Sequence, residues 1–248
     1  MHIPYHGTAD LHIHTTASDG TFEVEALLDY ITVCRRHLDV IAITDHDTLE
    51  ASLWALDNQH RYPFEIIPGV EVSSRDGHIL ALWVTTPIRR DMDLADTVTA
   101  IHEAGGVAVL AHPFHIEINI SRRCAKRHWM NPHVLIECGL DAIEVYNAGV
   151  LTPGCNWIAG QFTRRINLAV TGSSDAHTPG AVGSGVTRFA GHTGEDLRIA
   201  LAAKQTVAEG NPWPIIEYVN YLRHATQHKV PTSMAITNSS IQSTHPIR

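Results

Sequence analysis

Short apolar runs rich in β-branched residues recur along the chain and are bounded by polar or turn-forming residues. Runs of about four to eight such residues are typical of buried β-strands, because helices cover both faces of a parallel sheet. The pattern predicts strands at residues 8–14, 40–45, 66–73, 78–84, 107–111, 141–146 and 168–173.

Between several of these runs, apolar residues recur at helical spacing. Residues 22–37 carry acidic side chains early and Arg35, Arg36 and His37 late, an order that complements the helix dipole. We expect helices at residues 22–37, 47–59, 91–104 and 194–204. Strands that alternate with helices imply an α/β fold with a parallel sheet, and seven strand units predict a closed or nearly closed barrel.

The chain has 248 residues, of which 44% are hydrophobic, and this length suits one barrel domain. We expect that domain to span residues 1–225. Residues 226–248 are polar and lack apolar periodicity, which predicts a flexible tail. No apolar run approaches the ~18 residues of a membrane span, and the first residues lack the pattern of a secretion signal.

The excess of acidic residues limits the classes of molecule that the chain is expected to bind. Lys and Arg number 18 against 26 Asp and Glu, which gives a formal net charge of −8. This charge argues against binding to a nucleic-acid polymer or an anionic membrane. It leaves room for a small anionic substrate, because bound metal cations reverse the local field. The four cysteines contain no Cys-x-x-Cys pair, so a thiolate zinc site is not expected. Their even number would allow disulfides, but reduced thiols and a cytoplasmic location are the simpler expectation.

Histidines and carboxylates stand at the ends of the predicted strands. His12 and His14 are two residues apart, so both imidazoles point to one face of a strand. His46, His112 and Asp175 each follow the apolar run of their own strand. Barrel enzymes gather their catalytic groups at the carboxyl ends of strands, and imidazole with carboxylate suits zinc, manganese or iron. The pattern predicts a metal-dependent hydrolase.

The ordered motifs resemble the polymerase and histidinol phosphatase (PHP) family over residues about 10–210. They are the stretch 10–20, Thr-Asp-His-Asp at 44–47, Pro-Gly-Val-Glu at 68–71, His-Ile-Leu at 78–80, Ala-His-Pro at 111–113 and Ser-Asp-Ala-His at 174–177. The resemblance implies a distorted seven-stranded (β/α) barrel, which agrees with the strand count. It also implies up to three divalent metal ions.

Carried over residue by residue, the resemblance implies three metal sites. The first would contain His12, His14, Glu71 and Asp175. Glu71 would bridge to the second, which adds His78 and His112, and the third would contain Asp19, His46 and His177. Of these, Glu71, Asp175 and His177 are the candidate catalytic residues. Asp19 beside Gly20 also fits a turn or a helix cap, whereas Asp45 and Glu144 fit supporting roles behind the ligands.

The leading hypothesis is a phosphoesterase that cleaves a small phosphorylated metabolite or nucleotide with a metal-activated hydroxide. The alternatives are a metal-dependent carboxylic ester or amide hydrolase, and a noncatalytic metal-binding regulatory module. A phosphate substrate calls for basic residues beyond the metals, whereas a neutral ester favours an apolar pocket. The candidate aromatic pocket residues are Phe114, Trp129 and Trp157.

Basic side chains are the candidates for substrate binding. Arg122 and Arg123 belong to a basic cluster with Lys126 and Arg127, after the predicted ligand His112. A solvated loop face is as good an interpretation of this cluster as an anion-binding lid. Arg188 follows a glycine-rich stretch and is a further candidate. The oligomeric state and the substrate are left open by the sequence.

Overall fold

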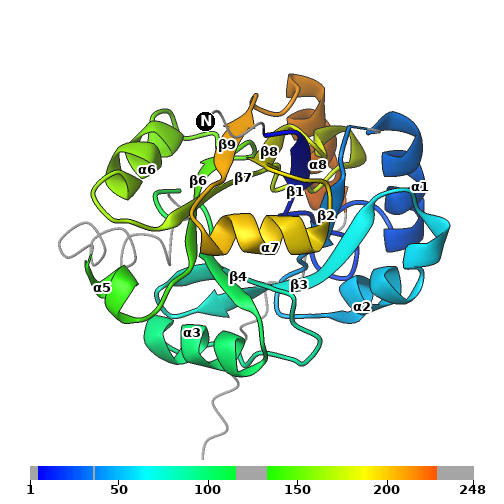
Figure 1. Cartoon of the computed structure of the whole chain (residues 1–248). Coiled ribbons are helices and arrows are strands. Elements are labelled where there is room, and N and C mark those ends of the chain that lie inside the picture. Colours follow the sequence, from blue (N-terminus) through cyan, green and yellow to red (C-terminus); the bar gives the residue numbers. More distant parts are fainter. Residues whose placement is uncertain (1–4, 36, 116–132, 228–248) are drawn as a thin grey trace, which may run out of the picture.

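The computed structural model describes residues 5–35, 37–115 and 133–227. At its centre a nine-stranded sheet, ordered β7-β6-β5-β4-β3-β2-β1-β8-β9, curls into a barrel (Figure 1). All the predicted strands are present, but the prediction of seven is wrong because β8 and β9 extend the sheet beyond β1. The strands are β1 (Gly7–Asp10), β2 (Val40–Ile43), β3 (Glu65–Ser74), β4 (Gly77–Leu82), β5 (Val107–Leu110), β6 (Ala142–Asn147), β7 (Ala169–Ser173), β8 (Gly185–Phe189) and β9 (Val207–Gly210).

The sheet is mixed rather than parallel. β4 runs antiparallel to β3 and β5, and β8 runs antiparallel to β1 and β9. The reversal at β4 follows from a tight hairpin in which Ser74 pairs with Gly77, and Gly77 has a φ of 129° that glycine tolerates. Such a short turn cannot hold the crossover that parallel neighbours need. The predicted parallel sheet is therefore wrong at β4 and β8.

The two edges of the sheet approach each other, so the barrel is nearly closed. Gly172 in β7 donates its N–H to Thr187 Oγ1 in β8 (3.0 Å), and this hydroxyl donates to Gly172 O (2.9 Å). Beyond the strand ends, His14 N donates to Ala176 O (2.9 Å), and Ala176 N donates to His12 O (3.2 Å). The segments that follow β1 and β7 thus meet at one end of the barrel.

Helices surround the sheet (Figure 1). The predicted helices correspond to α1, α2, α3 and α7, whereas α5, α6 and α8 are additional. Local chemistry explains two of the starts: the Asp93 side chain accepts from Asp96 N before α3, and Thr193 and Asp196 form a reciprocal capping box before α7. The helices are α1 (Val24–Cys34), α2 (Glu50–Asp57), α3 (Leu94–Glu103), α5 (His133–Glu137), α6 (Cys155–Thr163), α7 (Gly194–Ala202) and α8 (Ile215–Gln227), with 3-10 turns at Gln59–Arg61 and Pro179–Ala181.

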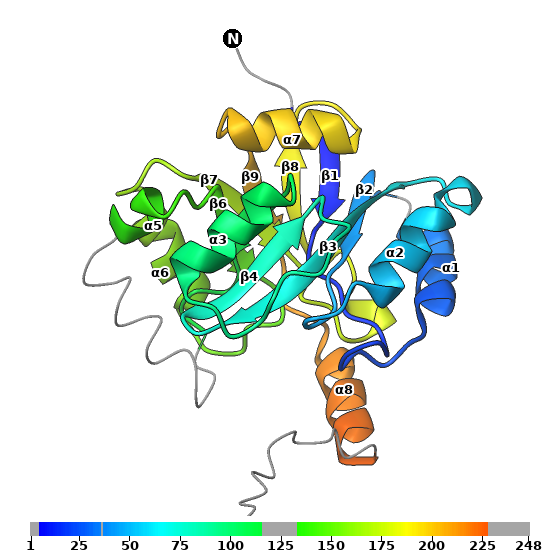
Figure 2. The same ribbon diagram turned by 90° about the horizontal axis from the view of Figure 1, so that it is seen from below.

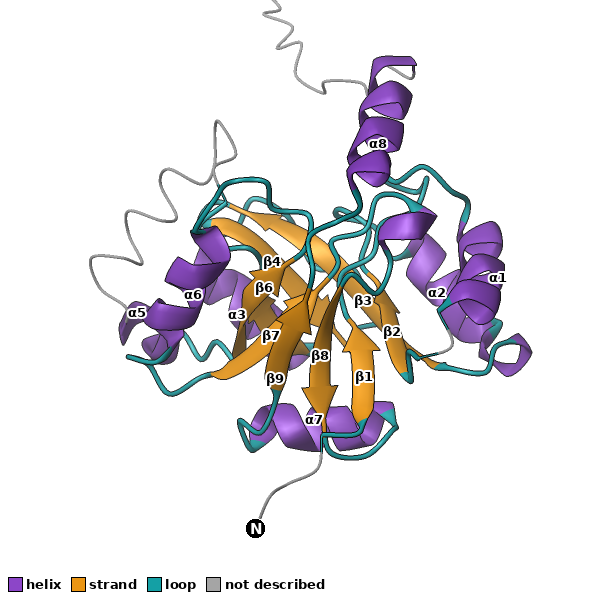
Figure 3. Ribbon diagram, turned by 90° about the horizontal axis from the view of Figure 1, so that it is seen from above, coloured by secondary structure: helices purple, strands orange, loops and turns teal. Residues whose placement is uncertain are grey.

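Helices α7 and α8 lie at opposite ends of the barrel (Figures 2 and 3). Leu197 and Leu201 of α7 share a core cluster with Val40 and Ala42 of β2, so α7 plugs its end of the barrel. The other two residues of β2, Ile41 and Ile43, belong to a second cluster with buried residues of α1 and α2. The interior is therefore apolar at the α7 end, and the polar residues gather at the α8 end.

Part of the predicted tail lies within the described chain. Helix α8 continues to Gln227, and the rest of segment 226–248 lies outside the described residues. The domain boundary at residue 225 therefore stays a prediction. None of the helices in the described ranges is both long and apolar enough to cross a bilayer.

Candidate metal centre

The strands bring the predicted ligands to the α8 end of the barrel. Glu71 lies within β3, and the neighbouring strand is β2. His46 follows the end of β2 and pairs with Glu71 in an isolated bridge. His78 lies near the start of β4, and because β4 runs antiparallel, this start is at the same end as the finishing ends of the parallel strands. The ligands that follow β1, β2, β5 and β7 are His12, His14, His46, His112 and Asp175.

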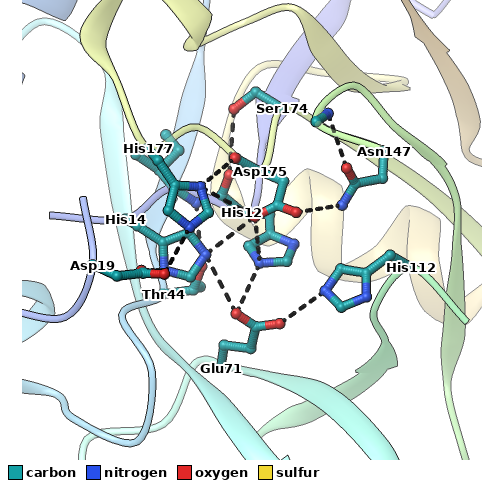
Figure 4. A network of polar contacts seen from close by, with 12 residues as sticks. His12, His14, Asp19, Thr44, Glu71, His112, Asn147, Ser174, Asp175 and His177 are labelled. Atoms are coloured by element: carbon teal, nitrogen blue, oxygen red, sulfur yellow. Dashed lines mark hydrogen bonds and ion pairs between the residues drawn. The ribbon is translucent and has the colours of Figure 1, made fainter. Parts of the chain in front are cut away.

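Glu71 is fully buried, and its two carboxylate oxygens face different histidines (Figure 4). Its Oε2 lies 3.1 Å from His12 Nε2 and 3.3 Å from His14 Nε2. Its Oε1 lies 2.9 Å from His78 Nδ1 and 3.1 Å from His112 Nε2. A carboxylate with ligand groups on both oxygens has the arrangement that a pair of shared metal ions requires.

Asp175 completes the first of these groups. Its Oδ1 lies 3.4 Å from His12 Nε2 and 3.2 Å from His14 Nε2. Its Oδ2 accepts a hydrogen bond from Asn147 Nδ2 (3.0 Å), which fixes the carboxylate so that Oδ1 faces the histidines. Asp175 and His112 both have positive φ, 52° and 26°. Such backbone costs of order 1–3 kcal/mol and persists where the surrounding structure requires it.

A second group forms around Asp19. His177 Nε2 lies 3.1 Å from Asp19 Oδ2, and His46 Nε2 lies 3.9 Å from the same oxygen. His14 Nδ1 lies 3.6 Å from Asp19 Oδ1. His46 also places Nδ1 3.1 Å from Glu71 Oε2, so it lies between the two groups. The predicted ligands are thus all brought together, and Asp19 belongs to the cluster in addition to any role in its turn.

Glu144 stands behind the ligands on β6. Its Oε1 lies 3.1 Å from His12 Nδ1, and its Oε2 accepts from His112 N (2.9 Å) and Asn147 Nδ2 (2.8 Å). The contact keeps a proton on His12 Nδ1, so Nε2 is the atom that faces Glu71 and would bind a metal ion. His177 is held similarly, because its Nδ1 lies 2.9 Å from the backbone oxygen of Asp175.

Asp45 supports the loop that carries Asp19. It accepts hydrogen bonds from Thr15 N and Thr15 Oγ1 (both 2.7 Å) and from Ser18 Oγ (2.6 Å). Ser18 Oγ in turn lies 3.4 Å from His14 Nδ1. Asp45 therefore acts behind the ligands, as the sequence predicts, but it does so by fixing the loop rather than by contacting a histidine ring.

The donor set fits divalent cations. Within the described part of the chain, no hydrogen bond reaches His12 Nε2, His14 Nε2 or Glu71 Oε2, although all three atoms are buried. Buried polar atoms without hydrogen bonds cost free energy. Here they converge on one another, so a cation between them would satisfy all three.

The pKa values of the cluster show how it balances charge without a cation. Burial alone would raise the pKa of Glu71, but His46 and the neighbouring imidazoles hold it well below its ordinary value. Burial likewise opposes protonation of His177, yet the charge of Asp19 raises the pKa of His177 to about 9. The carboxylates thus hold protons on nearby imidazoles, and a metal ion that binds here must displace them.

A cavity of about 270 Å³ opens onto the cluster and has two chemically different sides. One side consists of cluster ligands and His115. The other is apolar and aromatic, and it contains Gly149, Leu151, Trp213, Tyr218, Tyr221 and Leu222. We call this second side the aromatic wall. No lysine or arginine lines the cavity within the described ranges.

The candidate substrate residues lie elsewhere. Arg188 donates hydrogen bonds to Thr8 Oγ1 and Tyr5 O, near the start of β1, whereas the ligands follow the end of that strand. This placement gives no support to a substrate role for Arg188. Arg122, Arg123 and the rest of the basic cluster, like Trp129, lie outside the described residues.

The predicted aromatic lining also differs from the observed one. Phe114 is buried and packs edge-on against Phe162, and Trp157 is 70% exposed on α6, so neither lines the cavity. Tyr218 and Tyr221 line it instead, from a helix whose apolar periodicity is a signal that the sequence contains.

Comparisons with known proteins agree with the motifs. A family model described as PHP-associated matches residues 153–206, from α6 through α7. An uncharacterized protein of Methanocaldococcus jannaschii is 29% identical over 149 residues, which cover 56% of this chain and 81% of that protein.

Two named enzymes match shorter stretches. The 5′-3′ exoribonuclease Rnm of Escherichia coli is 45% identical over 67 residues, 26% of this chain and 22% of the enzyme. Phosphoribosyl 1,2-cyclic phosphate 1,2-diphosphodiesterase of Eggerthella lenta is 35% identical over 81 residues, 30% of each chain. The matched stretches thus span less than a third of either enzyme.

Solved structures share the fold. A two-domain protein from Bacteroides vulgatus, which contains a predicted PHP-like metal-dependent phosphoesterase, has a TM-score of 0.65 at 20% identity and covers 82% of this chain and 64% of its own. PsfC from Pseudomonas syringae has a TM-score of 0.65 at 20% identity, with coverage of 89% and 98%. The chain therefore has the fold of these PHP-like proteins and contains a PHP-associated segment, and its ordered motifs resemble those of the PHP family.

Proposed function

We propose that the protein is a metal-dependent phosphoesterase that acts on small phosphorylated molecules. The observation that carries the proposal is Glu71, whose two buried oxygens face separate sets of imidazoles. A pair of cations suits a phosphate ester, because positive charge stabilises its anionic phosphoryl oxygens. The names of the two enzyme relatives, a phosphodiesterase and an exoribonuclease, support the same bond type.

The metal assignments are also part of the proposal. His12, His14, Glu71 and Asp175 would hold one cation; Glu71, His78 and His112 a second; and Asp19, His46 and His177 a third. Mixed imidazole and carboxylate donors suit manganese, zinc or iron. Divalent ions in these sites would supply an acidified water and positive charge for the phosphoryl oxygens.

The chain's own residues prepare that chemistry. Glu144 and the backbone oxygen of Asp175 hold the protons on His12 and His177 at Nδ1, so both Nε2 atoms face the site. Asn147 orients Asp175. His177 stands at the open side of the cluster, where it lines the cavity. It is the candidate to position the leaving group.

A small substrate is favoured over a polymer. The cavity of about 270 Å³ is below the roughly 300–1,000 Å³ typical of ligand pockets. The net charge of −8 opposes a polyanion bound along the surface. The cytoplasmic location expected from the cysteines is likewise kept as a proposal.

The test begins with metal-stripped protein. Chelation should abolish phosphate release, and manganese or zinc should restore it. In heavy-oxygen water the label should enter the released phosphate. Glu71→Gln should lose both activity and bound metal, whereas Glu103→Gln, an exposed change on α3, should lose neither. Activity that survives chelation, or a trapped phospho-enzyme, would contradict the mechanism.

The aromatic wall favours one alternative enough to test it. An apolar surface beside the metals is also what a carboxylic ester hydrolase would need. A matched pair, 4-nitrophenyl phosphate and 4-nitrophenyl acetate, separates the two because only the reacting group differs. We expect a kcat/KM at least about tenfold higher for the phosphate. Preference for the acetate would support the carboxylic ester hypothesis, and no turnover of either or of other esters would support a regulatory module.

A further inference from the structure

The aromatic wall adjoins the candidate metal ligands through His177, and both line the same cavity. The ring of Tyr221 lies 4.8 Å from the ring of His177, and the ring of Trp213 lies 5.9 Å from it. Tyr218 stacks on Trp213 at 4.9 Å. A group bound at the ligands therefore has these rings as its nearest neighbours on the open side of the cavity.

The wall is anchored to the strands that carry the site. Trp213 Nε1 donates to Ser174 O (2.7 Å), beside Asp175, and Tyr218 OH donates to Ala148 O (3.1 Å), beside Asn147. Gly149 permits this close approach, because a Cβ there would meet Trp213 Cζ2 at 3.1 Å. The start of α8 is thus held at a fixed distance from the ligands.

Two of the polar groups in the wall are already engaged within the protein. Its Trp213 and Tyr218 donors already serve backbone carbonyls, so they offer no hydrogen to a sugar hydroxyl. A buried hydroxyl without a partner costs free energy, whereas a flat ring gains from contact with aromatic faces. Leu151 and Leu222 leave 67% and 61% of their surfaces exposed at the rim, where an apolar group would cover them.

We propose that the aromatic wall is a specificity element, which selects phosphate esters whose alcohol portion carries a flat, apolar ring. The inference rests on the proposed phosphoesterase function and names its substrate class. Tyr221 and Leu222 are the specificity-determining side chains, since they line the cavity from α8. Phosphate would lie at the ligands, and the ring would lie against the wall.

The test compares phenyl phosphate with methyl phosphate and glycerol phosphate on the manganese-loaded protein. Wild type should prefer phenyl phosphate by at least about tenfold in kcat/KM. Tyr221→Ala should lower kcat/KM for phenyl phosphate about three- to tenfold, mainly through KM, and change it less than about twofold for methyl phosphate. Tyr221→Phe should keep the preference. Ile199→Ala, an exposed apolar change on α7 at the opposite end, is the matched control.

A binding measurement checks the same point without turnover. Calorimetry with phenylphosphonate and methylphosphonate should show tighter binding of the phenyl compound in wild type and a smaller difference in Tyr221→Ala. Equal loss for all substrates would overturn the inference, because Tyr221 would then act through His177. A wild type that hydrolyses phenyl and glycerol phosphates equally well would overturn the inference alone. A wild type that releases phosphate from none of the three would overturn the proposed function as well.

Discussion

Glu144→Gln tests whether the hydrogen bonds behind the ligands set metal affinity. The native carboxylate accepts from His12 Nδ1 through Oε1, and from His112 N and Asn147 Nδ2 through Oε2. An amide has one accepting oxygen and a donating NH₂ group. With its oxygen in the Oε2 position, glutamine keeps two of these bonds and turns its NH₂ toward His12.

That orientation changes the tautomer of His12. A donor facing Nδ1 favours the proton on Nε2, the atom that lies 3.1 Å from Glu71 Oε2. Metal binding then requires His12 to return to the Nδ1–H form. In that form the Nδ1–H donor of His12 points at the NH₂ donor of the glutamine. A buried donor without an acceptor costs about 1–3 kcal/mol. We therefore expect affinity at the His12 group to fall about 10- to 100-fold, the range measured for outer-shell partners.

The assay is a manganese titration against a competing chelator at fixed pH. The Asp19 and His177 group makes none of its hydrogen bonds to Glu144, so its affinity should change little. Glu103→Gln removes an exposed carboxylate of the same size and should behave as wild type. If Glu144→Gln binds every metal equivalent as tightly as wild type, Glu144 does not control the His12 tautomer and the reasoning is refuted.

Three further predictions concern the frame of the site. Gly172→Ala should lower the free energy of unfolding in urea by about 1–3 kcal/mol, because its Cβ would lie 2.6 Å from a backbone oxygen of β8. Gly160→Ala on α6, where a Cβ meets no neighbouring atom, should raise it by about 0.5–1 kcal/mol. Equal effects would contradict the close approach of β7 to β8. Asp45→Ala should lose about 1–3 kcal/mol of stability and weaken metal binding at Asp19 more than at Glu71; uniform metal loss would contradict the loop-holding role. The pKa of His177 is raised to about 9 in the metal-free protein, so its protonated form stabilises the fold fully below about pH 6.5, and this stabilisation is lost as the pH rises through about 9. Manganese must displace this proton, so the gain in Tm on adding manganese should grow between these two pH values. A constant gain would argue against proton displacement.

The central strands could be predicted because each carries its own signal. In β2 the residues Val-Ile-Ala-Ile are all buried, so a plain apolar run marks the strand without reference to its neighbours. β9 has no such run, since its residues are half-buried or exposed and it depends on pairing with β8. Strand direction at β4 has a local signal, but it lies in the two-residue turn between Ser74 and Gly77 and not in the apolar pattern.

The clustering of most candidate ligands could be predicted for a similar reason, because these residues follow an apolar run or lie within one, whereas Asp19 does neither. The supporting residues were less predictable. Glu144 is one acid within a strand, and only the fold shows that it reaches both His12 and the backbone of His112. The aromatic wall shows the limit most clearly, because only the fold brings Trp213 and Tyr221 to the cavity, at the end of the barrel where α8 lies.

The backbone segments that meet at the α8 end of the barrel also carry residues of the candidate site. The hydrogen bonds that join the segments after β1 and β7 involve His12, His14 and Ala176. The two histidines are candidate ligands, and Ala176 lies between two others, Asp175 and His177. The backbone bonds at this end of the barrel therefore fix the spacing of candidate ligands that are 163 positions apart in sequence, as for His12 and Asp175. Conversely, a cation shared by these side chains would hold the segments after β1 and β7 together. Because such a site is absent from the unfolded chain, its binding free energy adds to the stability of the fold.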